Sequence, residues 1–417
     1  MSGPIQKILI IGINYRPEPT GIAPYTTGLA EHLAGNGYQV QVITAEPHYP
    51  SWTHVRPRGL WKITEDVENG VKVTRVPIYV PRRQSALRRG LYEFTFLVMA
   101  NFVARRVAGI DVVLGVVPSL GGGVAAAQLA RRMRRPYLLW IQDIVSLSAQ
   151  ESGAAGRSAR LLEGILARIE RVLARNAKRV LIISDAFKGH FQHLGVDNRR
   201  LLRVRNWTHM GPAEGELRRR VPSDTLACLH IGNLGYKQDL ETILDCAGRA
   251  KEAHLPISFT IVGDGSRREQ VQQLIYRREL DNVQLLPLAP ADELRVLLAT
   301  ADVFLLAQRD SVRDMALPSK LTTYFAWGRP VVAATNGSSA AAMEIESAGG
   351  GIVVQPGNGE EMLVALQRLL RNVDEYEKLQ RGAVAYAQNN LSNETCLAVL
   401  KGAVDEACQE VEICRSI

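Results

Sequence analysis

The sequence has few of the residues that build disulfide frameworks, metal centres or membrane spans. Its 417 residues include only five cysteines, an odd number without CxxC spacing, which argues against a disulfide framework and fits a reducing, cytoplasmic compartment. The eight histidines show no metal-ligand spacing, and no Ser/His/Asp arrangement can be assembled from sequence neighbours. No signal peptide is visible, and the apolar stretch 91–104 is too short to cross a bilayer. We therefore expect no metal, no protein nucleophile and no membrane span.

Charge and length narrow the class of protein further. The net charge of +8 favours anionic partners such as nucleotides, diphosphates, nucleic acid or an acidic membrane face. Nucleic acid is the weakest of these, because the arginines are scattered over several segments without interleaved aromatic residues. A chain of 417 residues exceeds one ordinary hydrophobic core, so two domains are expected.

The first half of the chain alternates short apolar runs with helical patterns. Lys7–Ile13 is a compact β-branched run, which is typical of a strand buried on both faces. A glycine-bearing loop over 14–21, a helix to about Leu33 and a strand over 39–44 follow, as at the start of a parallel doubly wound sheet. Further strands are predicted at 71–76, 111–116, 137–141 and 179–183.

The second half repeats this architecture after a polar segment. Strands are predicted at 225–231, 258–262, 283–286, 303–306, 331–334 and 352–354. We predict a first domain over 1–206, a linker over 207–221, a second domain over 222–392, and a C-terminal helix over 393–417 that could pack back on the first domain. The fold class is α/β, with two Rossmann-like, doubly wound parallel-sheet domains that face each other across a cleft.

One basic and apolar segment departs from this pattern. Arg82, Arg83, Arg88 and Arg89 precede the apolar stretch 91–104, in which Glu93 is the only charge. Such a segment suits a helix that lies on an anionic membrane surface. It equally suits a core helix of the first domain that leaves its arginines in solvent.

The stretch from Asp310 to Ala334 predicts a seat for a phosphate. A polar loop leads into a helix whose first turn would contain Pro318, Ser319 and Lys320. Free backbone N–H groups at a helix start, with a hydroxyl and an ammonium group beside them, are suited to a phosphate or diphosphate. The alternative is an ordinary strand–helix connection with a solvated lysine.

Other candidates follow strands at the carboxyl edges of the two sheets. Asp143 follows the run 137–141, where its carboxylate could orient a sugar hydroxyl, stabilise developing positive charge, or cap the next turn. Gly263-Asp264-Gly265 could contact a nucleotide or form an ordinary turn. Gly121–Gly123 could let the backbone approach a ligand or turn the chain into the next helix. Lys237 and Lys320, with Arg309 nearby, are the cations best placed for a leaving diphosphate.

Seven short motifs, in this order, resemble family 4 glycosyltransferases of the two-domain GT-B fold. They are Ile11–Ile22, Tyr25-Thr26, Gly115–Pro118, Ile141–Asp143, Asn206-Trp207, Gly232–Gly235, and Leu317–Leu321 with Gly328–Pro330. The resemblance covers nearly the whole chain. It is strongest to the WcaI-like branch of colanic acid, O-antigen and capsule sugar transferases.

The resemblance implies a retaining, metal-independent transfer of a sugar from a UDP- or GDP-sugar, without a cofactor. The implied acceptor is a lipid-linked saccharide in exopolysaccharide, capsule or lipopolysaccharide biosynthesis. The implied location is the cytoplasmic face of the inner membrane, with peripheral contact through about 82–106. In such enzymes the leaving phosphate is thought to act as the base, so that the protein supplies positioning and charge stabilisation.

The sequence departs from the family at its donor-binding residues. The family's Glu-x7-Glu pair falls on Met315 and Thr323, and Asp314 could replace the first carboxylate. The family's Arg and Lys after the first strand of the second domain fall on Asn233 and Gln238, and Lys320 could restore the lost charge. The predicted catalytic residues are Asp143 and Lys320; the predicted substrate-binding residues are Gly21, Tyr25, Gly232, Asn233, Lys237, Gly263, Asp264, Gly265, Leu288, Arg309, Asp314, Pro318, Ser319 and Thr323.

Two other functions remain compatible with the sequence. Nucleotide-sugar 2-epimerases share the two-domain architecture but need no lipid acceptor, so the basic and apolar segment argues mildly against an isomerase. A non-catalytic nucleotide-sugar-binding protein that kept the fold would explain the missing Glu pair.

Overall fold

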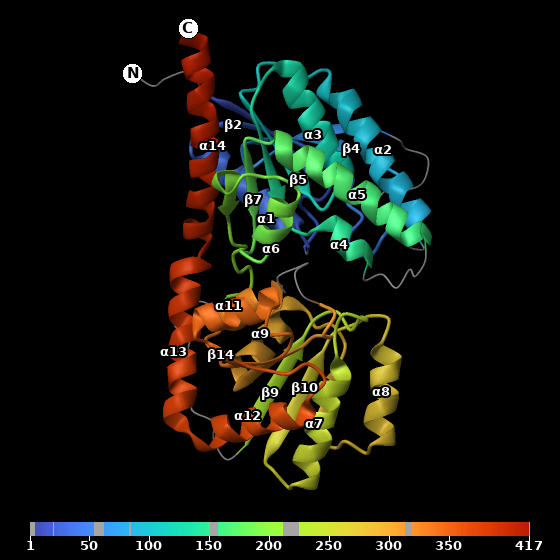
Figure 1. The fold of residues 1–417 in the computed structure, drawn as a ribbon, viewed down its shortest axis with the longest axis vertical. Helices are drawn as coiled ribbons and strands as arrows, with labels where there is room; N and C mark the ends of the chain where they lie inside the picture. The colour runs from blue at the N-terminus through green and yellow to red at the C-terminus, as the bar shows by residue number, and fades with distance from the viewer. Residues whose placement is uncertain are drawn as a thin grey trace. The chain divides into compact units, whose positions relative to one another are not determined.

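The computed structural model describes residues 5–19, 21–53, 62–82, 85–150, 157–211, 225–312 and 319–416. The chain divides into two compact units. Unit 1 comprises Met1–Arg205 with Glu394–Ile417, and unit 2 comprises Asn206–Asn393. Each unit has one mostly or wholly parallel sheet with helices around it (Figure 1), so the predicted α/β class with two parallel-sheet domains is confirmed.

The sheet of unit 1 has the strand order β3-β4-β2-β1-β5-β6-β7-β8. Its strands are β1 (Lys7–Ile11), β2 (Gln39–Ala45), β3 (Thr64–Glu68), β4 (Val71–Val76), β5 (Val112–Val117), β6 (Tyr137–Ile141), β7 (Arg179–Ile182) and β8 (Leu201–Arg203). All neighbouring strands are parallel except β3 and β4, which are antiparallel. Sequence reasoning missed β3, because this edge strand is largely exposed and has no apolar run.

The helices of unit 1 connect these strands. They are α1 (Ala23–Gly35), α2 (Ala86–Ala104), α3 (Leu120–Met133), α4 (Val145–Gln150), α5 (Arg157–Asn176), α6 (Phe187–His193) and α14 (Asn393–Ser416). Helices α2, α3 and α5 form one layer over the sheet, with α3 in contact with both neighbours (Figure 1). Helix α14 returns to this unit from the far end of the sequence: Arg179 donates to Glu406 at 2.7 Å, and Lys178 forms an ion pair with Glu410 at 2.6 Å.

Helix α2 contains the basic and apolar segment. It begins earlier than predicted, because Ser85 caps it by accepting a hydrogen bond from the Arg88 backbone N–H at 3.4 Å. Arg88 and Arg89 therefore belong to its first turns rather than preceding it. One face of α2 is buried through Tyr92, Phe96, Ala100, Val103 and Ala104, as a core helix requires. Among the helices that the structure describes, none is long and apolar enough to cross a membrane.

The glycines at 121–123 allow α2 to pack closely on the first turn of α3. A Cβ atom at Gly121 would lie 2.3 Å from the carbonyl oxygen of Glu93, and one at Gly122 would lie 3.0 Å from the Phe96 ring. The Glu93 carboxylate accepts hydrogen bonds from the Gly121 N–H at 3.0 Å and the Ser119 hydroxyl at 2.7 Å. The Glu93 carboxylate, which is the only charge in the apolar stretch, thus accepts hydrogen bonds from donors at the N-terminus of α3. These glycines allow close packing of α2 on α3. The sequence had suggested a ligand contact or a turn into the next helix, and neither interpretation included this packing.

We expect Gly121→Ala to lower the free energy of unfolding by about 1–3 kcal/mol, because the added methyl group overpacks the contact between α2 and α3. Gly164→Ala is the matched control: Gly164 lies within α5, and a Cβ atom there meets nothing within 4 Å. This control should stabilise the protein by about 0.5–1 kcal/mol through helix propensity. Urea denaturation of both variants measures the difference. Equal effects of the two substitutions would contradict the packing role.

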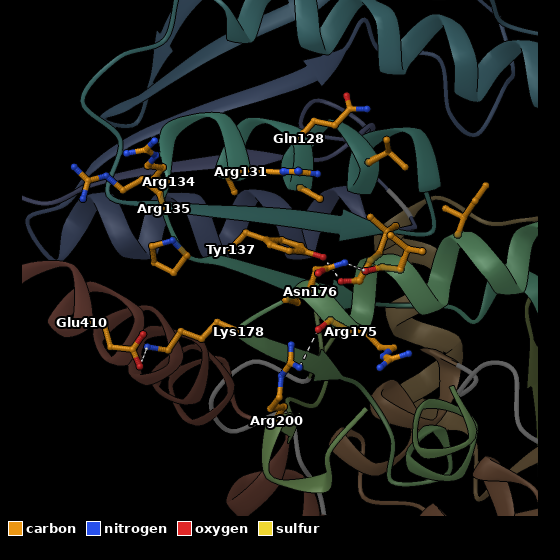
Figure 2. Close-up of a pocket in the computed structure, with 18 of the residues that line it drawn as sticks. Gln128, Arg131, Arg134, Arg135, Tyr137, Arg175, Asn176, Lys178, Arg200 and Glu410 are labelled. Carbon is orange, nitrogen blue, oxygen red and sulfur yellow. Dashed lines mark hydrogen bonds and ion pairs between the residues drawn. The ribbon is translucent and has the colours of Figure 1, made fainter. Parts of the chain in front are cut away.

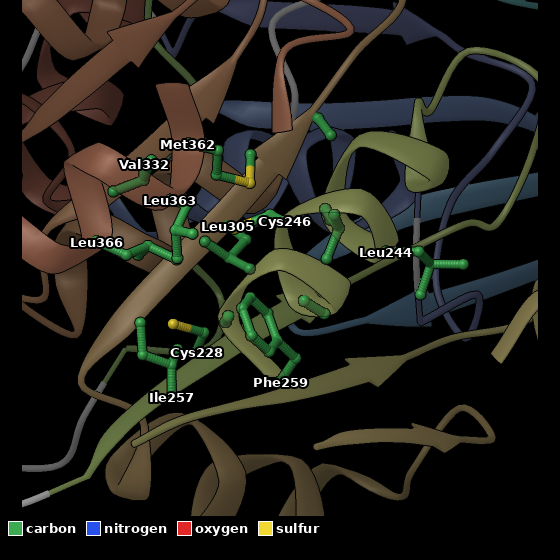
Figure 3. Close-up of a cluster of buried hydrophobic side chains, with 14 of the residues drawn as sticks. Cys228, Leu244, Cys246, Ile257, Phe259, Leu305, Val332, Met362, Leu363 and Leu366 are labelled. Carbon is green, nitrogen blue, oxygen red and sulfur yellow. The ribbon is translucent and has the colours of Figure 1, made fainter. Parts of the chain in front are cut away.

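The sheet of unit 2 is entirely parallel, with the order β11-β10-β9-β12-β13-β14. Its strands are β9 (Leu226–Ile231), β10 (Ile257–Val262), β11 (Val283–Leu286), β12 (Val303–Ala307), β13 (Val331–Ala334) and β14 (Gly351–Val354). Its helices are α7 (Leu240–Glu252), α8 (Arg268–Arg277), α9 (Ala291–Thr300), α10 (Ser319–Ala326), α11 (Ala340–Ala348), α12 (Gly359–Arg371) and α13 (Val373–Asn390). Side chains from the sheet, α7 and α12 form one hydrophobic core on one face of it (Figure 3).

The first residues of the predicted linker are packed into unit 2. Trp207 is 1% exposed, and the Thr208 N–H donates to the Leu391 carbonyl at 3.4 Å. The Trp327 indole N–H donates to the Met210 carbonyl at 2.6 Å. Residues 212–224, which include the rest of this segment up to Val221, lie outside the described residues.

Candidate functional site

The candidate anion site of unit 2 lies where the strand order reverses. Strands β9 and β12 are neighbours, and the chain leaves them toward opposite halves of the sheet. Loops after such a pair diverge and leave a crevice at the carboxyl edge, where ligands of doubly wound sheets bind. The loop after β9 begins at Gly232, and the loop after β12 begins at Gln308, which is bridged to Gln238.

Lys320, in the first turn of α10, reaches this crevice. Its Nζ donates to the Gln238 Oε1 atom at 3.1 Å, and it lies 3.0 Å from where a Cβ atom of Gly232 would be. No carboxylate among the described residues forms an ion pair with it. Burial of the ammonium group without a compensating anion lowers the Lys320 pKa to about 7. The structure thus brings Lys320 to Gly232 and Gln238, although it lies 82 residues from Gln238 in the sequence.

His230 lies on β9, near Lys320. Its Nδ1 atom is 3.0 Å from the Leu305 carbonyl oxygen, and its buried Nε2 atom has no hydrogen-bond partner among the described residues. Burial, and then the charge of Lys320, lowers the His230 pKa well below its ordinary value. The imidazole is therefore neutral at physiological pH. Its Nδ1 atom, as the donor to a carbonyl, carries the proton.

The glycines at the ends of β9 and β10 let two loops approach each other. A Cβ atom at Gly263 would lie 1.9 Å from the Gly232 carbonyl oxygen, and one at Gly265 would lie 2.5 Å from the Asn233 side chain. Gly265 also has a φ of +151°, a conformation that favours glycine. The Leu234 N–H donates to the Asp264 carbonyl at 2.8 Å. The Asp264 carboxylate accepts from the Gly265 N–H at 2.7 Å, as an ordinary turn does.

The remaining predicted donor-site residues lie at the same edge with their side chains in solvent. Asn233, Lys237, Leu288 and Arg309 are exposed, and the Arg309 N–H donates to the Lys237 carbonyl at 3.2 Å. Thr323 lies three residues after Lys320 in α10 and is half-buried. Asp314 and Pro318 lie outside the described residues, and so does the side chain of Ser319.

Two arginines that sequence reasoning missed hold these loops in place. Arg267 is 3% exposed and forms a bidentate ion pair with Glu241 beneath the loop 232–238, and its guanidinium lies 5.8 Å from the Tyr236 ring. Arg268 donates to the carbonyl oxygens of Gly263 at 2.6 Å and Leu286 at 2.8 Å. Arg268 thereby joins the ends of β10 and β11.

Unit 1 places Asp143 at the carboxyl edge of its own sheet. Asp143 follows β6 after Gln142 and is half-buried, and its charge contributes to the raised pKa of Tyr49 after burial of that phenol. The Tyr49 ring lies 3.1 Å from where a Cβ atom of Gly21 would be, and Gly21 has a φ of +69°. The structure therefore brings Gly21, Tyr49 and Asp143 together. Tyr49 was missed because a lone tyrosine after a strand carries no pattern.

Tyr25 and Glu170 have packing and positioning roles here. Tyr25 is 6% exposed within α1, and burial and then Cys396 of α14 raise its pKa. Its contact with a substrate stays a prediction. The Glu170 carboxylate of α5 accepts from the Val145 N–H at 2.7 Å and the Ser146 N–H at 3.2 Å. It thus fixes the loop that follows Asp143.

An aromatic cluster that includes Tyr49 lies near Asp143. Its members are His48, Tyr49, Trp52 and Tyr92, with ring centroids 5.5–6.0 Å apart. The Arg89 guanidinium of α2 lies 4.9 Å from the Trp52 ring centroid and 5.2 Å from that of Tyr92. Cation–π contacts of this kind hold a guanidinium in place without neutralising its charge. The first turns of α2 thus carry a fixed positive charge near the end of the sheet.

The residues described contain no cluster of three or more metal-ligating side chains. Unit 2 carries glycine backbone, one partly neutral lysine and exposed cations, a set of groups that suits the binding and charge stabilisation of an anionic leaving group. Unit 1 carries a carboxylate with aromatic neighbours.

Comparison with known proteins agrees with this arrangement. The family description "Glycosyl transferase 4-like domain" matches residues 20–207, and "Glycosyl transferases group 1" matches residues 225–372. The chain is 31% identical over 408 residues to WcaI of Escherichia coli K12, named as a colanic acid biosynthesis glycosyl transferase, covering 94% of this chain and 98% of that protein.

Solved structures with the same fold include two from cyanobacteria. Sucrose-phosphate synthase from Thermosynechococcus elongatus has a TM-score of 0.73 at 16% identity, covering 96% of this chain and 98% of its own. HepE from Anabaena, in complex with UDP and glucose, has a TM-score of 0.67 at 17% identity, covering 96% and 100%. The chain therefore belongs to the GT-B glycosyltransferases. Within them it has a glycosyl transferase 4-like domain followed by a group 1 domain, and it is similar to WcaI over nearly its whole length.

Proposed function

We propose that this glycosyltransferase transfers a sugar from a UDP- or GDP-sugar to a lipid-linked saccharide, with retention of configuration and without a metal. The observation that carries the proposal is the position of Lys320, whose ammonium group lies 3.1 Å from the Gln238 side chain. Gln238 stands in a loop where the resembling family has its lysine, so Lys320 supplies the missing charge from helix α10. The similarity to WcaI favours an acceptor from exopolysaccharide biosynthesis.

Each group has a chemical role in this proposal. The crevice of unit 2 binds the diphosphate against the backbone of Gly232 and Gly263. Lys320 neutralises the negative charge that develops as the phosphate leaves. Asp143 stabilises the positive charge that develops on the sugar or orients an acceptor hydroxyl. The departing phosphate oxygen takes the proton of that hydroxyl, so no protein base is needed.

The lipid-linked acceptor is supported by the outer face of α2. Five large apolar side chains, 44–85% exposed, recur along that helix: Leu87, Leu91, Phe94, Val98 and Phe102. Their spacing of three and four residues places them in one stripe. The stripe begins beside Arg88 and Arg89, and Arg106 lies 5.4 Å from the Phe102 ring at the other end. An apolar stripe between basic ends suits contact with an anionic membrane surface.

Thermal unfolding with UDP, GDP, ADP and NAD tests the donor class. A nucleotide at a hundred times its dissociation constant should stabilise the protein by about 2.7 kcal/mol. We expect stabilisation by UDP or GDP only. Stabilisation by ADP or NAD alone, or by none of the four, would contradict a UDP- or GDP-sugar donor.

Vesicle sedimentation tests the membrane contact. We expect the Leu91→Ser/Phe94→Ser/Val98→Ser variant to lose most of its binding to phosphatidylglycerol vesicles, because each lost side chain removes roughly 1.5–3 kcal/mol of apolar burial. Val364→Ser/Val373→Ser, at exposed apolar positions of unit 2, is the control and should bind as the unmodified protein does. Unchanged vesicle binding of the α2 variant would remove the proposed contact.

A further inference from the structure

A cavity of unit 1 lies at the amino edge of its sheet. This groove, of about 1170 Å³, runs between α3 and α5 and is closed at one end by α14 (Figure 2). It is bordered by Pro136 and Tyr137, Lys178, and Arg200, which stand at the amino ends of β6, β7 and β8. Asp143, beyond the carboxyl end of β6, is about 20 Å away along the strand. The groove is therefore separate from the candidate transfer site.

The groove has a large excess of positive charge. Arg131, Arg134, Arg135, Arg168 and Arg175 line it, and none of them forms an ion pair within the part of the chain that the structure describes. The only carboxylate among the lining residues that the structure describes is that of Glu410, which is already paired with Lys178 at 2.6 Å (Figure 2). Unpaired guanidinium groups gathered around a concave surface favour an anionic ligand.

One wall of the groove is apolar. Ile165 and Val172 of α5 are 50% and 53% exposed, and Val124 and Ala127 of α3 lie across from them in the lining. Leu161, one turn before Ile165, is also exposed and extends the apolar surface along α5. Exposed aliphatic side chains beside a cluster of arginines indicate a ligand that has both a charged and an apolar part.

The lining also excludes some anions. Among the described residues of the groove, Tyr137 is the only aromatic one, and it is 5% exposed with its hydroxyl bonded to the Leu173 carbonyl (Figure 2). A nucleotide base would therefore have no exposed aromatic face to stack on. A free phosphate would leave the aliphatic wall in water.

We propose that this groove binds one anionic phospholipid, with its phosphate among Arg131, Arg134 and Arg135 and an acyl chain along Ile165 and Val172. The inference goes beyond sugar transfer, and it does not depend on the identity of donor or acceptor. It adds to the proposed membrane contact of α2 a site for a single lipid, in the same layer of helices.

Soluble short-chain lipids test the groove without a membrane. The probe is dihexanoylphosphatidylglycerol below its micelle concentration, and isothermal calorimetry measures its binding to the full chain. We expect saturable binding of one molecule. Glycerophosphoglycerol, which lacks the acyl chains, and dihexanoylphosphatidylcholine, which has no net charge, should each bind at least tenfold more weakly, because each loses one of the two interactions.

Surface variants assign the binding to the groove. Arg131→Gln/Arg134→Gln/Arg135→Gln should weaken binding of the probe by about tenfold or more, because charge-assisted contacts are lost. Arg277→Gln/Arg278→Gln/Arg371→Gln, which removes the same charge from exposed positions of unit 2, is the control and should leave the affinity unchanged. Ile165→Asn/Val172→Asn should also weaken binding, and because both side chains are exposed the variant should fold.

Four results would overturn the proposal. If glycerophosphoglycerol bound as tightly as dihexanoylphosphatidylglycerol, the groove would be a phosphate site. If dihexanoylphosphatidylcholine bound as tightly, the net charge of the lipid would not contribute to binding. Equal losses in the two arginine variants would indicate a nonspecific charge effect. Self-association that disappears in Ile165→Asn/Val172→Asn, without lipid binding, would make this face an interface between copies of the chain. Failure of the α2 vesicle test alone would leave the groove intact, because the short-chain probe needs no membrane surface.

Discussion

Replacing Lys320 by methionine is expected to weaken the binding of UDP or GDP by about 1.5–3 kcal/mol, or roughly ten- to a hundredfold, because a charge-assisted contact with the diphosphate is lost. Turnover should fall as well, since the same charge stabilises the leaving group. The stability of the free protein should rise in the same variant. A buried ammonium without an anion is unfavourable, as the lowered pKa of about 7 indicates, and methionine removes it.

The pH dependence of binding distinguishes Lys320 from a merely structural residue. In the free protein Lys320 loses its proton near pH 7, against an ordinary value of 10.5, and a bound diphosphate would restore that higher pKa. Nucleotide affinity should therefore fall about tenfold per pH unit from pH 7 upward, since binding takes up a proton. Below pH 7 this contribution is constant. The free energy of unfolding should rise over the same range, because the unfolded chain then holds the proton that the folded chain has lost.

Two variants control for this interpretation. Lys320→Arg keeps a charge that does not titrate in this range, so its nucleotide affinity should be nearly independent of pH between 7 and 9. Lys378→Met, at an exposed position of unit 2, should change neither affinity nor its pH dependence. A Lys320→Met protein that is less stable than the unmodified protein but binds nucleotide equally well would show that Lys320 is structural.

Replacing Asp143 by asparagine is expected to lower kcat by about 10²–10³, because the carboxylate would no longer stabilise the charge that develops in the transition state. The affinity for the nucleotide should not change, because Asp143 belongs to unit 1 and the nucleotide site to unit 2. Initial rates with a saturating sugar nucleotide measure the first effect, and calorimetry measures the second. Asparagine keeps the size and hydrogen-bonding capacity of the side chain, so the fold should persist.

Glu65→Gln is the matched control for Asp143→Asn. Glu65 lies on the edge strand β3, where it pairs with Lys72 at 2.9 Å, and four strands of the sheet separate β3 from β6. Removing the Glu65 charge should leave kcat equal, within experimental error, to that of the unmodified protein. A kcat of Asp143→Asn within about threefold of the unmodified value, or less than ~0.7 kcal/mol of barrier, would refute the catalytic assignment.

The architecture was predictable because strands buried in a parallel sheet appear in the sequence as continuous apolar runs. The strands β1, β6 and β12, for example, are apolar at nearly every position and are almost entirely buried. The edge strand β3 was not predictable, because its sequence TEDVE has a single apolar residue and that residue is exposed. This edge strand pairs only with β4, and such pairing leaves no periodic signature in the sequence.

The site was predictable only where a motif marks it. Lys320 and Gly232 stand in short motifs that resemble the family, and Gly263 stands in a Gly-Asp-Gly turn after a strand. The structure brings these three residues to one edge. Arg267, Tyr49 and Glu170 had no such signal, because their partners Glu241, Gly21 and Val145 come from other elements. Long-range polar contacts of this kind depend on the folded topology, and no local pattern encodes them.

The return of α14 to unit 1 has a consequence for biosynthesis. The ribosome makes all of unit 2 before it makes this helix, although unit 1 comes first in the chain. Until then, Arg179 and Lys178 lack the carboxylates of Glu406 and Glu410. Unit 2 can therefore complete its fold on the nascent chain while unit 1 still awaits its last helix. Unit 2, which is translated second, can thus finish folding before unit 1, which is translated first.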